Sequence, residues 1–201
     1  MLSFFKKFTM QKSKAPRIWI SVAIISLIGV FFFPLWKITL DAAQFPEGLR
    51  MDIWINKISG SSKNIIQNVN ILNHYIGMQY IEPDSIKELK YFPYVNVGLI
   101  LFGRLAFIVH KKWVYFIWAL LVIILGTLGI YDFYLWLYDY GHNLNPMAPI
   151  KIPGMSYMPP LLGEKDLLNF YVTSYPALGA LLLGLATLSG WLSFITYKKS
   201  N

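Results

Sequence analysis

Cysteine is absent from this chain of 201 residues, and charged residues make up only 14% of it. Without cysteine the protein has no disulfide framework, no thiolate metal site, no iron–sulfur cluster and no cysteine nucleophile. Soluble domains carry about a quarter charged residues, whereas 56% of this chain is hydrophobic. Both values are typical of a membrane protein.

Recognisable catalytic motifs are absent as well. The sequence contains no GxSxG, HExxH, P-loop or dinucleotide-binding pattern, the short motifs that position a nucleophile, a metal or a phosphate. It has only three histidines, and their places do not support a Ser/His/Asp arrangement. We therefore expect a protein that is not an enzyme.

Long apolar stretches predict helices that cross a membrane, because a bilayer core about 30 Å thick needs roughly 20 apolar residues in a helix. Residues 18–36 and 167–197 carry no charge, and 113–137 carries none over most of its length. Residues 91–109 have the required length but include Arg104. The sequence therefore predicts an all-α, polytopic membrane protein with four transmembrane helices.

Basic residues predict the orientation of these helices. Three short segments hold nine of the 18 basic residues and none of the ten acidic ones, and such an excess marks the cytoplasmic side. The same pattern accounts for the net charge of +8 without a nucleic-acid partner. The expected order is a cytoplasmic tail (1–17), a first span (18–36), a periplasmic segment (37–90), a second span (91–109), a cytoplasmic turn (110–112), a third span (113–137), a Pro/Met-rich periplasmic loop (138–166), a fourth span (167–197) and a cytoplasmic tail (198–201).

Three charged residues in or near the spans could suggest transport or proton relay, but each has an ordinary explanation. Arg104 is close enough to the inner end of its helix for its side chain to reach the interface. Asp132 and Asp139 are expected to be solvated or paired, as carboxylates at an interface normally are. Pro176 is expected to bend the fourth helix near its outer end.

The two periplasmic segments are both expected to be ordered. In the first, alternating apolar residues over 49–58 allow either a short strand or a turn of helix, and helical spacing predicts a helix from Ser61 or Ser62 to about Ile81. The second, residues 138–166, has too many prolines for a helix and is expected to form an ordered loop. The apolar face of the predicted helix consists of Ile65, Ile66, Val69, Leu72 and Ile76.

Methionine and histidine are concentrated in these periplasmic segments, which hold five of the seven methionines and two of the three histidines. Thioether and imidazole are the soft ligands that suit cuprous copper where thiols oxidise. His74 and Met78 are four residues apart and would therefore lie on one face of the predicted helix. The pattern therefore predicts copper as a cofactor. The candidate ligands are His74, Met78, His142, Met155 and Met158.

A packing role is the alternative for the same methionines, because methionine commonly fills gaps against aromatic side chains. Met51 and Met147 are expected to serve only in this way. Copper retention by the chain distinguishes the copper-binding interpretation from the packing interpretation.

Three stretches of the sequence resemble a known family: residues 44–49 (QFPEGL), 72–78 (LNHYIGM) and 153–159 (PGMSYMP). They are similar to small four-helix membrane proteins encoded beside nitrous oxide reductase and its copper-maturation factors, in bacteria that export this enzyme by the Sec route. The resemblance extends from Phe33 to about Tyr175. It implies a bacterial cytoplasmic-membrane protein that assists an exported copper enzyme in assembly, copper loading, docking or electron supply.

The resemblance implies two kinds of partner besides the lipid bilayer: the periplasmic copper enzyme or its maturation factors, and other membrane subunits. A second interpretation, from the residues alone, is a structural subunit of a larger membrane or respiratory complex that binds no metal. A transporter is not expected, because four spans with one intramembrane charge show no inverted repeat or broken-helix pair.

Overall fold

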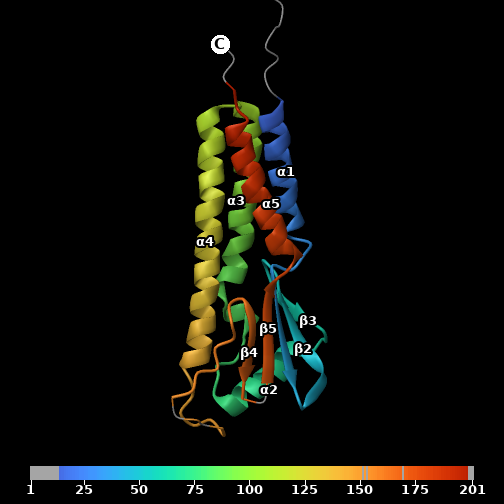
Figure 1. Ribbon diagram of the computed structural model, residues 1–201, viewed down its shortest axis with the longest axis vertical. Coiled ribbons are helices and arrows are strands. Elements are labelled where there is room, and N and C mark those ends of the chain that lie inside the picture. The colour runs from blue at the N-terminus through green and yellow to red at the C-terminus, as the bar shows by residue number, and fades with distance from the viewer. Residues whose placement is uncertain (1–13, 151, 153, 169, 199–201) are drawn as a thin grey trace, which may run out of the picture.

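A bundle of four helices carries a sheet-containing domain at one end, as Figure 1 shows. The computed structural model describes residues 14–150, 152, 154–168 and 170–198. Most of the predicted cytoplasmic tails therefore lies outside the described residues. The described chain begins and ends at the same end of the bundle, opposite the sheet.

The expectation of an all-α protein is wrong, because the chain forms a five-stranded antiparallel sheet in the order β3-β2-β1-β5-β4. Three strands come from the first predicted periplasmic segment, and two come from the region just before the last helix. The strands are β1 (Trp36–Ala42), β2 (Phe45–Ile53), β3 (Ile58–Gly60), β4 (Gly163–Leu167) and β5 (Phe170–Pro176).

Three of the described helices are long and apolar enough to cross a membrane: α3 (Lys87–Val109), α4 (Lys112–His142) and α5 (Leu178–Ile195). The fourth bundle helix, α1 (Ala15–Gly29), is equally apolar but has only 15 residues. Their outward surfaces are rich in exposed leucine, isoleucine and aromatic side chains. This surface suggests contact with lipid, and the helices are compatible with a multi-pass membrane protein.

The predicted span over residues 167–197 begins too early. Its first part is strand, and α5 starts only at Leu178. The stretch FYVTSYP lacks charge, which is why it was included in a helix, but it alternates buried and exposed residues as a strand does. Pro176 ends β5 and does not bend a helix.

The two central strands are direct continuations of two bundle helices. The chain leaves α1, turns and enters β1, while β5 leads straight into α5 (Figure 1). The two strands pair along their whole length, from Trp36 opposite Pro176 to Ala42 opposite Phe170. The Trp36 indole N–H also donates a hydrogen bond of 2.8 Å to the hydroxyl of Ser174. This pairing joins the first and last helices to one sheet.

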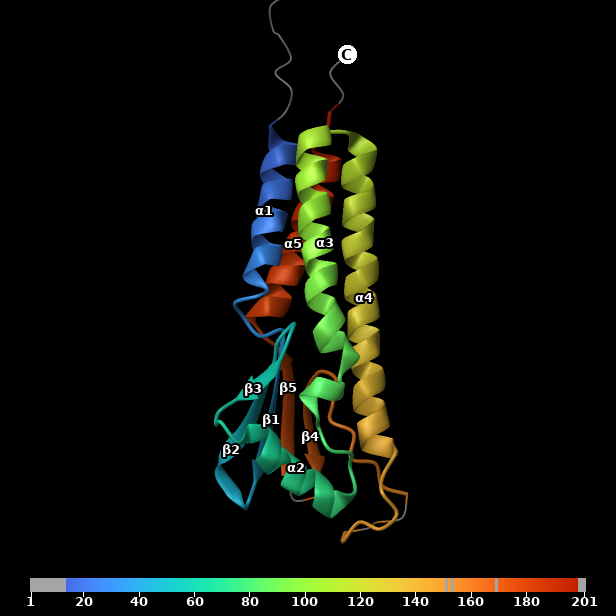
Figure 2. The ribbon, with the colours of Figure 1, turned by 180° about the vertical axis from the view of Figure 1, so that it is seen from behind.

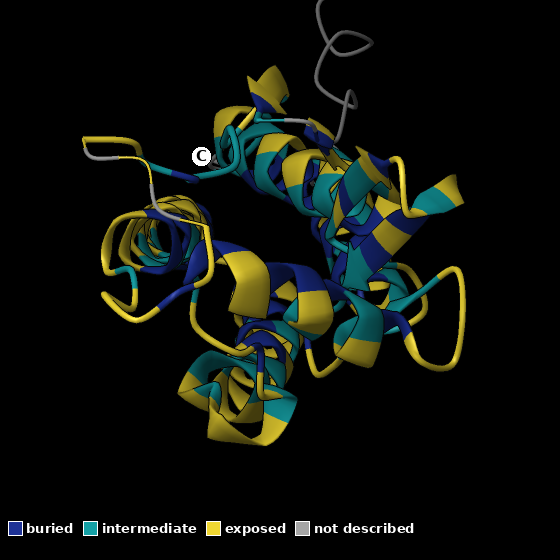
Figure 3. Ribbon diagram, turned by 90° about the horizontal axis from the view of Figure 1, so that it is seen from below, coloured by how far each residue is buried: buried dark blue, intermediate teal, exposed yellow. Residues whose placement is uncertain are grey.

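One face of the sheet is covered and the other is open. Helix α2 (Ile65–Ile76) and the outer end of α4 pack on the covered face, and Figure 3, viewed from this end, shows buried residues on the inward sides of the elements. The predicted apolar face of α2 is confirmed at four positions, which are buried in this core. These positions are Ile65, Val69, Leu72 and Ile76.

A second core lies within the bundle around Trp118, which is fully buried. Glycines at 103 and 190 leave room for its ring, since a Cβ at either position would contact it. The Trp118 indole N–H donates to the Leu99 carbonyl at 2.8 Å, and the Asn96 amide donates to the Leu27 carbonyl at 2.9 Å. The second bond satisfies a carbonyl near the end of α1, where helical partners run out.

The outer end of α4 is attached to the Pro/Met-rich loop at Gly141. The Tyr157 N–H donates to the Gly141 carbonyl at 2.9 Å, and the backbone of Met158 lies directly against the Gly141 Cα. A side chain at position 141 would overlap that backbone. The absence of a Cβ therefore permits the loop to close the core of the sheet domain.

We expect Gly141→Ala to destabilise the protein by roughly 1–3 kcal/mol, the usual cost of adding atoms to a packed contact. The matched control is Gly126→Ala in the same helix, where a Cβ would meet nothing within 4 Å. Thermal unfolding in detergent, followed by tryptophan fluorescence, compares the two variants. Equal transition temperatures would show that the Gly141 contact is not needed.

Candidate functional site

Helix α2 lies at the end of the domain farthest from the bundle (Figure 2). The side of α2 that faces away from the sheet carries an exposed hollow. Its aromatic and aliphatic side chains are unusually open, with Ile71 exposed to 50%, Tyr75 to 49% and Tyr80 to 53%. Polar groups lie between them. We call this set the α2 surface: Gln67, Asn70, Ile71, His74, Tyr75 and Tyr80.

The hollow is held open by the way that α2 ends. Gly77 adopts a left-handed conformation with φ of 80°, which stops the helix and reverses the chain. The returning segment is fixed by Asn70, whose amide N–H donates to the Ile81 carbonyl at 3.1 Å and whose oxygen accepts from the Ile81 N–H at 2.7 Å. Both groups of the Asn70 side chain are thus used, so it orders the site.

The imidazole of His74 lies parallel to the ring of Tyr80. The two ring planes differ by 4°, their centroids are 6.4 Å apart, and Nδ1 of His74 shares a hydrogen bond of 3.1 Å with the Tyr80 hydroxyl. Both side chains are nevertheless exposed. The pair is therefore ordered before any ligand arrives, which lowers the entropy that binding would cost.

The Pro/Met-rich loop borders the α2 surface. The Asn145 N–H donates to the Gly77 carbonyl at 2.8 Å, and the Ile150 N–H donates to the Tyr75 carbonyl at 2.9 Å. The loop also presents apolar side chains to solvent, with Met147 exposed to 82%. The expectation that Met147 is a packing residue is therefore wrong.

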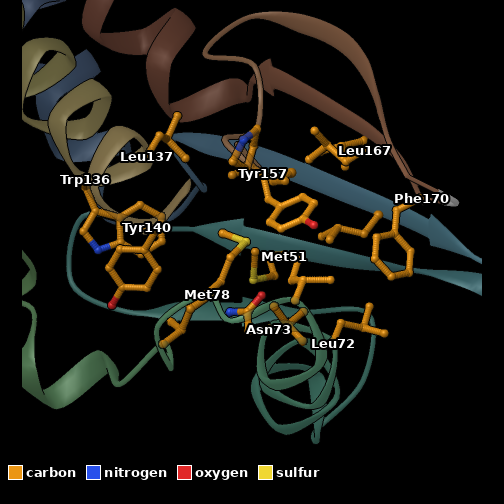
Figure 4. A pocket seen from close by; sticks show the side chains of 17 residues that line it. Met51, Leu72, Asn73, Met78, Trp136, Leu137, Tyr140, Tyr157, Leu167 and Phe170 are labelled. Carbon is orange, nitrogen blue, oxygen red and sulfur yellow. The ribbon is translucent and has the colours of Figure 1, made fainter. Parts of the chain in front are cut away.

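An internal cavity of about 40 Å³ lies between α2, the sheet and α4 (Figure 4). Met51 from β2 and Met78 from the segment after α2 both line it, together with Trp136 and Tyr157. The lining is almost entirely apolar, and the buried hydroxyl of Tyr157 has no hydrogen-bond partner among the described residues. Met51 is buried in this core, in agreement with the packing role expected for it.

The predicted pair of His74 and Met78 does not form on one helix face. Helix α2 ends at Ile76, so Met78 follows the reversal at Gly77 and turns inward to the cavity, while His74 stays on the exposed hollow. The four-residue spacing would place both side chains on one face only if the helix continued through residue 78, and Gly77 ends it first.

The other three predicted ligands lie near the outer end of α4 and in the loop. The Nδ1–H of His142 donates to the Tyr138 carbonyl at 2.9 Å, and its ring stacks on Tyr138 with centroids 4.0 Å apart. Met158 is half-buried against the sheet core, whereas Met155 is exposed. The described residues contain no cluster of three or more histidine or carboxylate side chains that could hold a metal ion.

Sequence reasoning missed Ile71, Tyr75 and Tyr80 as parts of a site. Ile71 and Tyr75 are four residues apart, and neither belongs to the apolar face predicted for α2. Two apolar side chains on the polar face of an amphipathic helix were therefore the available signal.

The chain matches no protein-family model, and no curated protein matches it.

A separate polar cluster occupies the open face of the sheet. The hydroxyls of Tyr171 and Tyr175 both donate to the carboxylate of Glu164 on β4, the latter at 3.1 Å. These two bonds lower the pKa of Glu164, and the bond to Glu164 raises the pKa of Tyr171 from 10 to about 12. The cluster ties β4, an edge strand, to β5.

We expect Glu164→Ala to lower the pKa of Tyr171 from about 12 towards 10. Because the folded state holds this proton more tightly, the stabilisation is intact below pH 10 and is lost as pH rises from 10 to about 12. Tyrosinate absorbance, with the Tyr171→Phe titration subtracted, measures the change. Asp166→Ala should have a smaller effect, since the Asp166 charge contributes least. Ionisation of Tyr171 near 10 in the unaltered chain would contradict this assignment.

Proposed function

We propose that this chain is an integral membrane accessory protein that docks an extracytoplasmic protein through its α2 surface. The observation that carries the proposal is the group of exposed side chains at Ile71, Tyr75 and Tyr80, held around an ordered hollow far from the bundle. Tyrosine and large aliphatic groups surrounded by polar neighbours are typical of the centres of protein interfaces.

The proposed location is the bacterial cytoplasmic membrane, with the sheet domain in the periplasm. Basic residues at the far end of the bundle support this orientation. Arg17 donates to the Phe107 carbonyl at 3.3 Å, and the Lys112 ammonium lies 5.1 Å from the ring centroid of Phe194. Arg17 of α1 and Lys112 of α4 thus place positive charge at the end of the bundle opposite the sheet.

The proposed partner is a periplasmic copper enzyme, nitrous oxide reductase, or one of its maturation factors. The resemblance of residues 44–49, 72–78 and 153–159 supports this choice. One of the three stretches, 72–78, includes His74 and Tyr75 of the α2 surface. The proposed docking site therefore contains part of one motif of the resemblance.

Copper handling is the second part of the proposal, and the geometry of His142 supports it. Its Nδ1 must carry the proton that is donated to the Tyr138 carbonyl, so the neutral ring has its Nε2 lone pair free. Such a bond from the other ring nitrogen is the usual way to orient a metal-binding histidine. The copper ligands proposed with it are Met155 and Met158 of the adjoining loop. His74 is proposed as a separate copper-binding group on the α2 surface, and Met78, which turns inward to the cavity, is no longer included.

A structural subunit without a metal role would use the same α2 surface. It differs from the first proposal in its partner, an integral membrane complex, and in its indifference to copper. The partner recovered with the chain and its copper content therefore distinguish the two.

We expect Tyr75→Ala to weaken capture of the periplasmic copper enzyme by the tagged full-length chain roughly tenfold, since truncating a central interface tyrosine commonly costs that much. Capture from native membranes in mild detergent, quantified by mass spectrometry, measures the effect.

The matched control is Tyr171→Ala, which removes an exposed tyrosine from the open face of the sheet. It should capture the enzyme as the unaltered chain does. Recovery of no copper enzyme by the unaltered chain, or equal capture by both variants, would overturn the docking proposal.

We expect His142→Ala to lower the amount of cuprous copper retained after equilibrium dialysis, as measured by elemental analysis. His74→Ala should lower it less, because Nδ1 of His74 shares its bond with a hydroxyl that can donate, and its tautomer is not fixed. Unchanged copper content in His142→Ala, or no copper in the unaltered chain, would remove the metal role and favour the structural subunit.

A further inference from the structure

The turn between β2 and β3 lies at the bundle end of the sheet (Figure 2). Ile53, the last residue of β2, pairs with Trp36 and accepts a hydrogen bond of 2.8 Å from the Leu35 N–H. Leu35 in turn accepts from the Ala177 N–H at 2.9 Å, directly before α5. Leu35 and Ala177 mark the junction where the chain crosses between the bundle helices and the sheet. Residues 54–57 therefore extend past this junction on the side of the bundle.

Side chains at the junction between the sheet and the bundle helices are apolar and exposed. Phe32 and Phe33, between α1 and β1, are exposed to 67% and 40%, and Leu178, at the start of α5, to 46%. In a bundle surrounded by lipid, such exposure marks the region where hydrocarbon gives way to headgroups. The turn over 54–57 stands beside this region.

The chemistry of the turn suits a headgroup layer. The Trp54 N–H donates to the Lys57 carbonyl at 2.8 Å, and the Trp54 indole N–H donates to the Ser59 hydroxyl at 2.8 Å. These bonds fix the indole, and the Lys57 ammonium lies 4.6 Å from its ring centroid. Tryptophan and lysine are both favoured at membrane interfaces. The indole ring packs on acyl chains, while the lysine ammonium contacts the phosphate of the lipid headgroup.

Nearby acidic charge does not oppose this role. Asp52, the acid nearest along β2, is paired with Arg50 at 3.4 Å. Lys57 itself is exposed, and Asn56 beside it is exposed and uncharged. The tip therefore presents one cation towards the bilayer surface.

We propose that the β2–β3 turn, residues 54–57, inserts into the headgroup layer of the bilayer that holds the bundle, with Lys57 binding phospholipid phosphate and Trp54 packing at the acyl boundary. This contact holds the sheet domain at a set angle to the membrane. It lies at the opposite end of the domain from the α2 surface, so it stands or falls independently of the docking proposal.

The absence of cysteine gives a direct test, because a single introduced cysteine can be labelled without background. The full chain carrying Asn56→Cys is spin-labelled and reconstituted into phosphatidylcholine vesicles. Collisions with oxygen, which partitions into lipid, and with a water-soluble nickel complex then report the depth of the label. The matched control is Glu47→Cys near the other end of β2, which is also exposed.

We expect the label at position 56 to show several-fold less nickel collision and more oxygen collision than the label at position 47. Replacing half of the lipid by phosphatidylglycerol should reduce nickel collision at 56 further, and Lys57→Glu should reverse that change. Equal nickel access at the two positions in both lipids would overturn the proposal. Protection at 56 that is insensitive to phosphatidylglycerol and to Lys57→Glu would overturn the phosphate contact.

Discussion

The pairing of β1 with β5 is the constraint on which the rest of this structure depends. Seven residues of each strand face one another, and the Trp36–Ser174 hydrogen bond joins positions 138 residues apart. Because β1 continues from α1 and β5 leads into α5, the pairing sets the distance between these helices where they leave the bundle. It also places the remaining strands, since β2 and β4 add to the two outer edges of the pair.

The sheet domain has three surfaces of different character, and each follows from this frame. The covered face needs α2 and the outer end of α4 to bury its apolar side chains. The open face carries the alternate side chains, including Glu164 and its two tyrosines. The end next to the bundle is given by the register of β2. Helix α2 is then left with one free side, and that side carries the exposed tyrosines.

Much of the helical architecture could be predicted from the sequence, because uncharged stretches have few alternatives in a membrane protein. The apolar face of α2 was also predictable from its spacing. The sheet was missed for a specific reason: its central strand β5 is uncharged and directly precedes an apolar helix, so composition alone merges the two. The alternation of Phe170, Val172 and Ser174 was the signal that separates them. For the candidate site, the positions of His74 and Met78 on opposite sides of the α2 end depend on a single left-handed glycine, which spacing arguments did not include.

The order of the strands also limits how the domain can be assembled. The strand β5 is synthesised after every other strand of the sheet, while its partner β1 is synthesised before every other strand. Until residues 163–176 are available, β1 has one open edge and the sheet core lacks Phe170 and Val172. Contacts of such long sequence separation form slowly. The early strands and α2 therefore keep apolar surface exposed during the synthesis of two long helices, and α5 follows β5 directly in the chain.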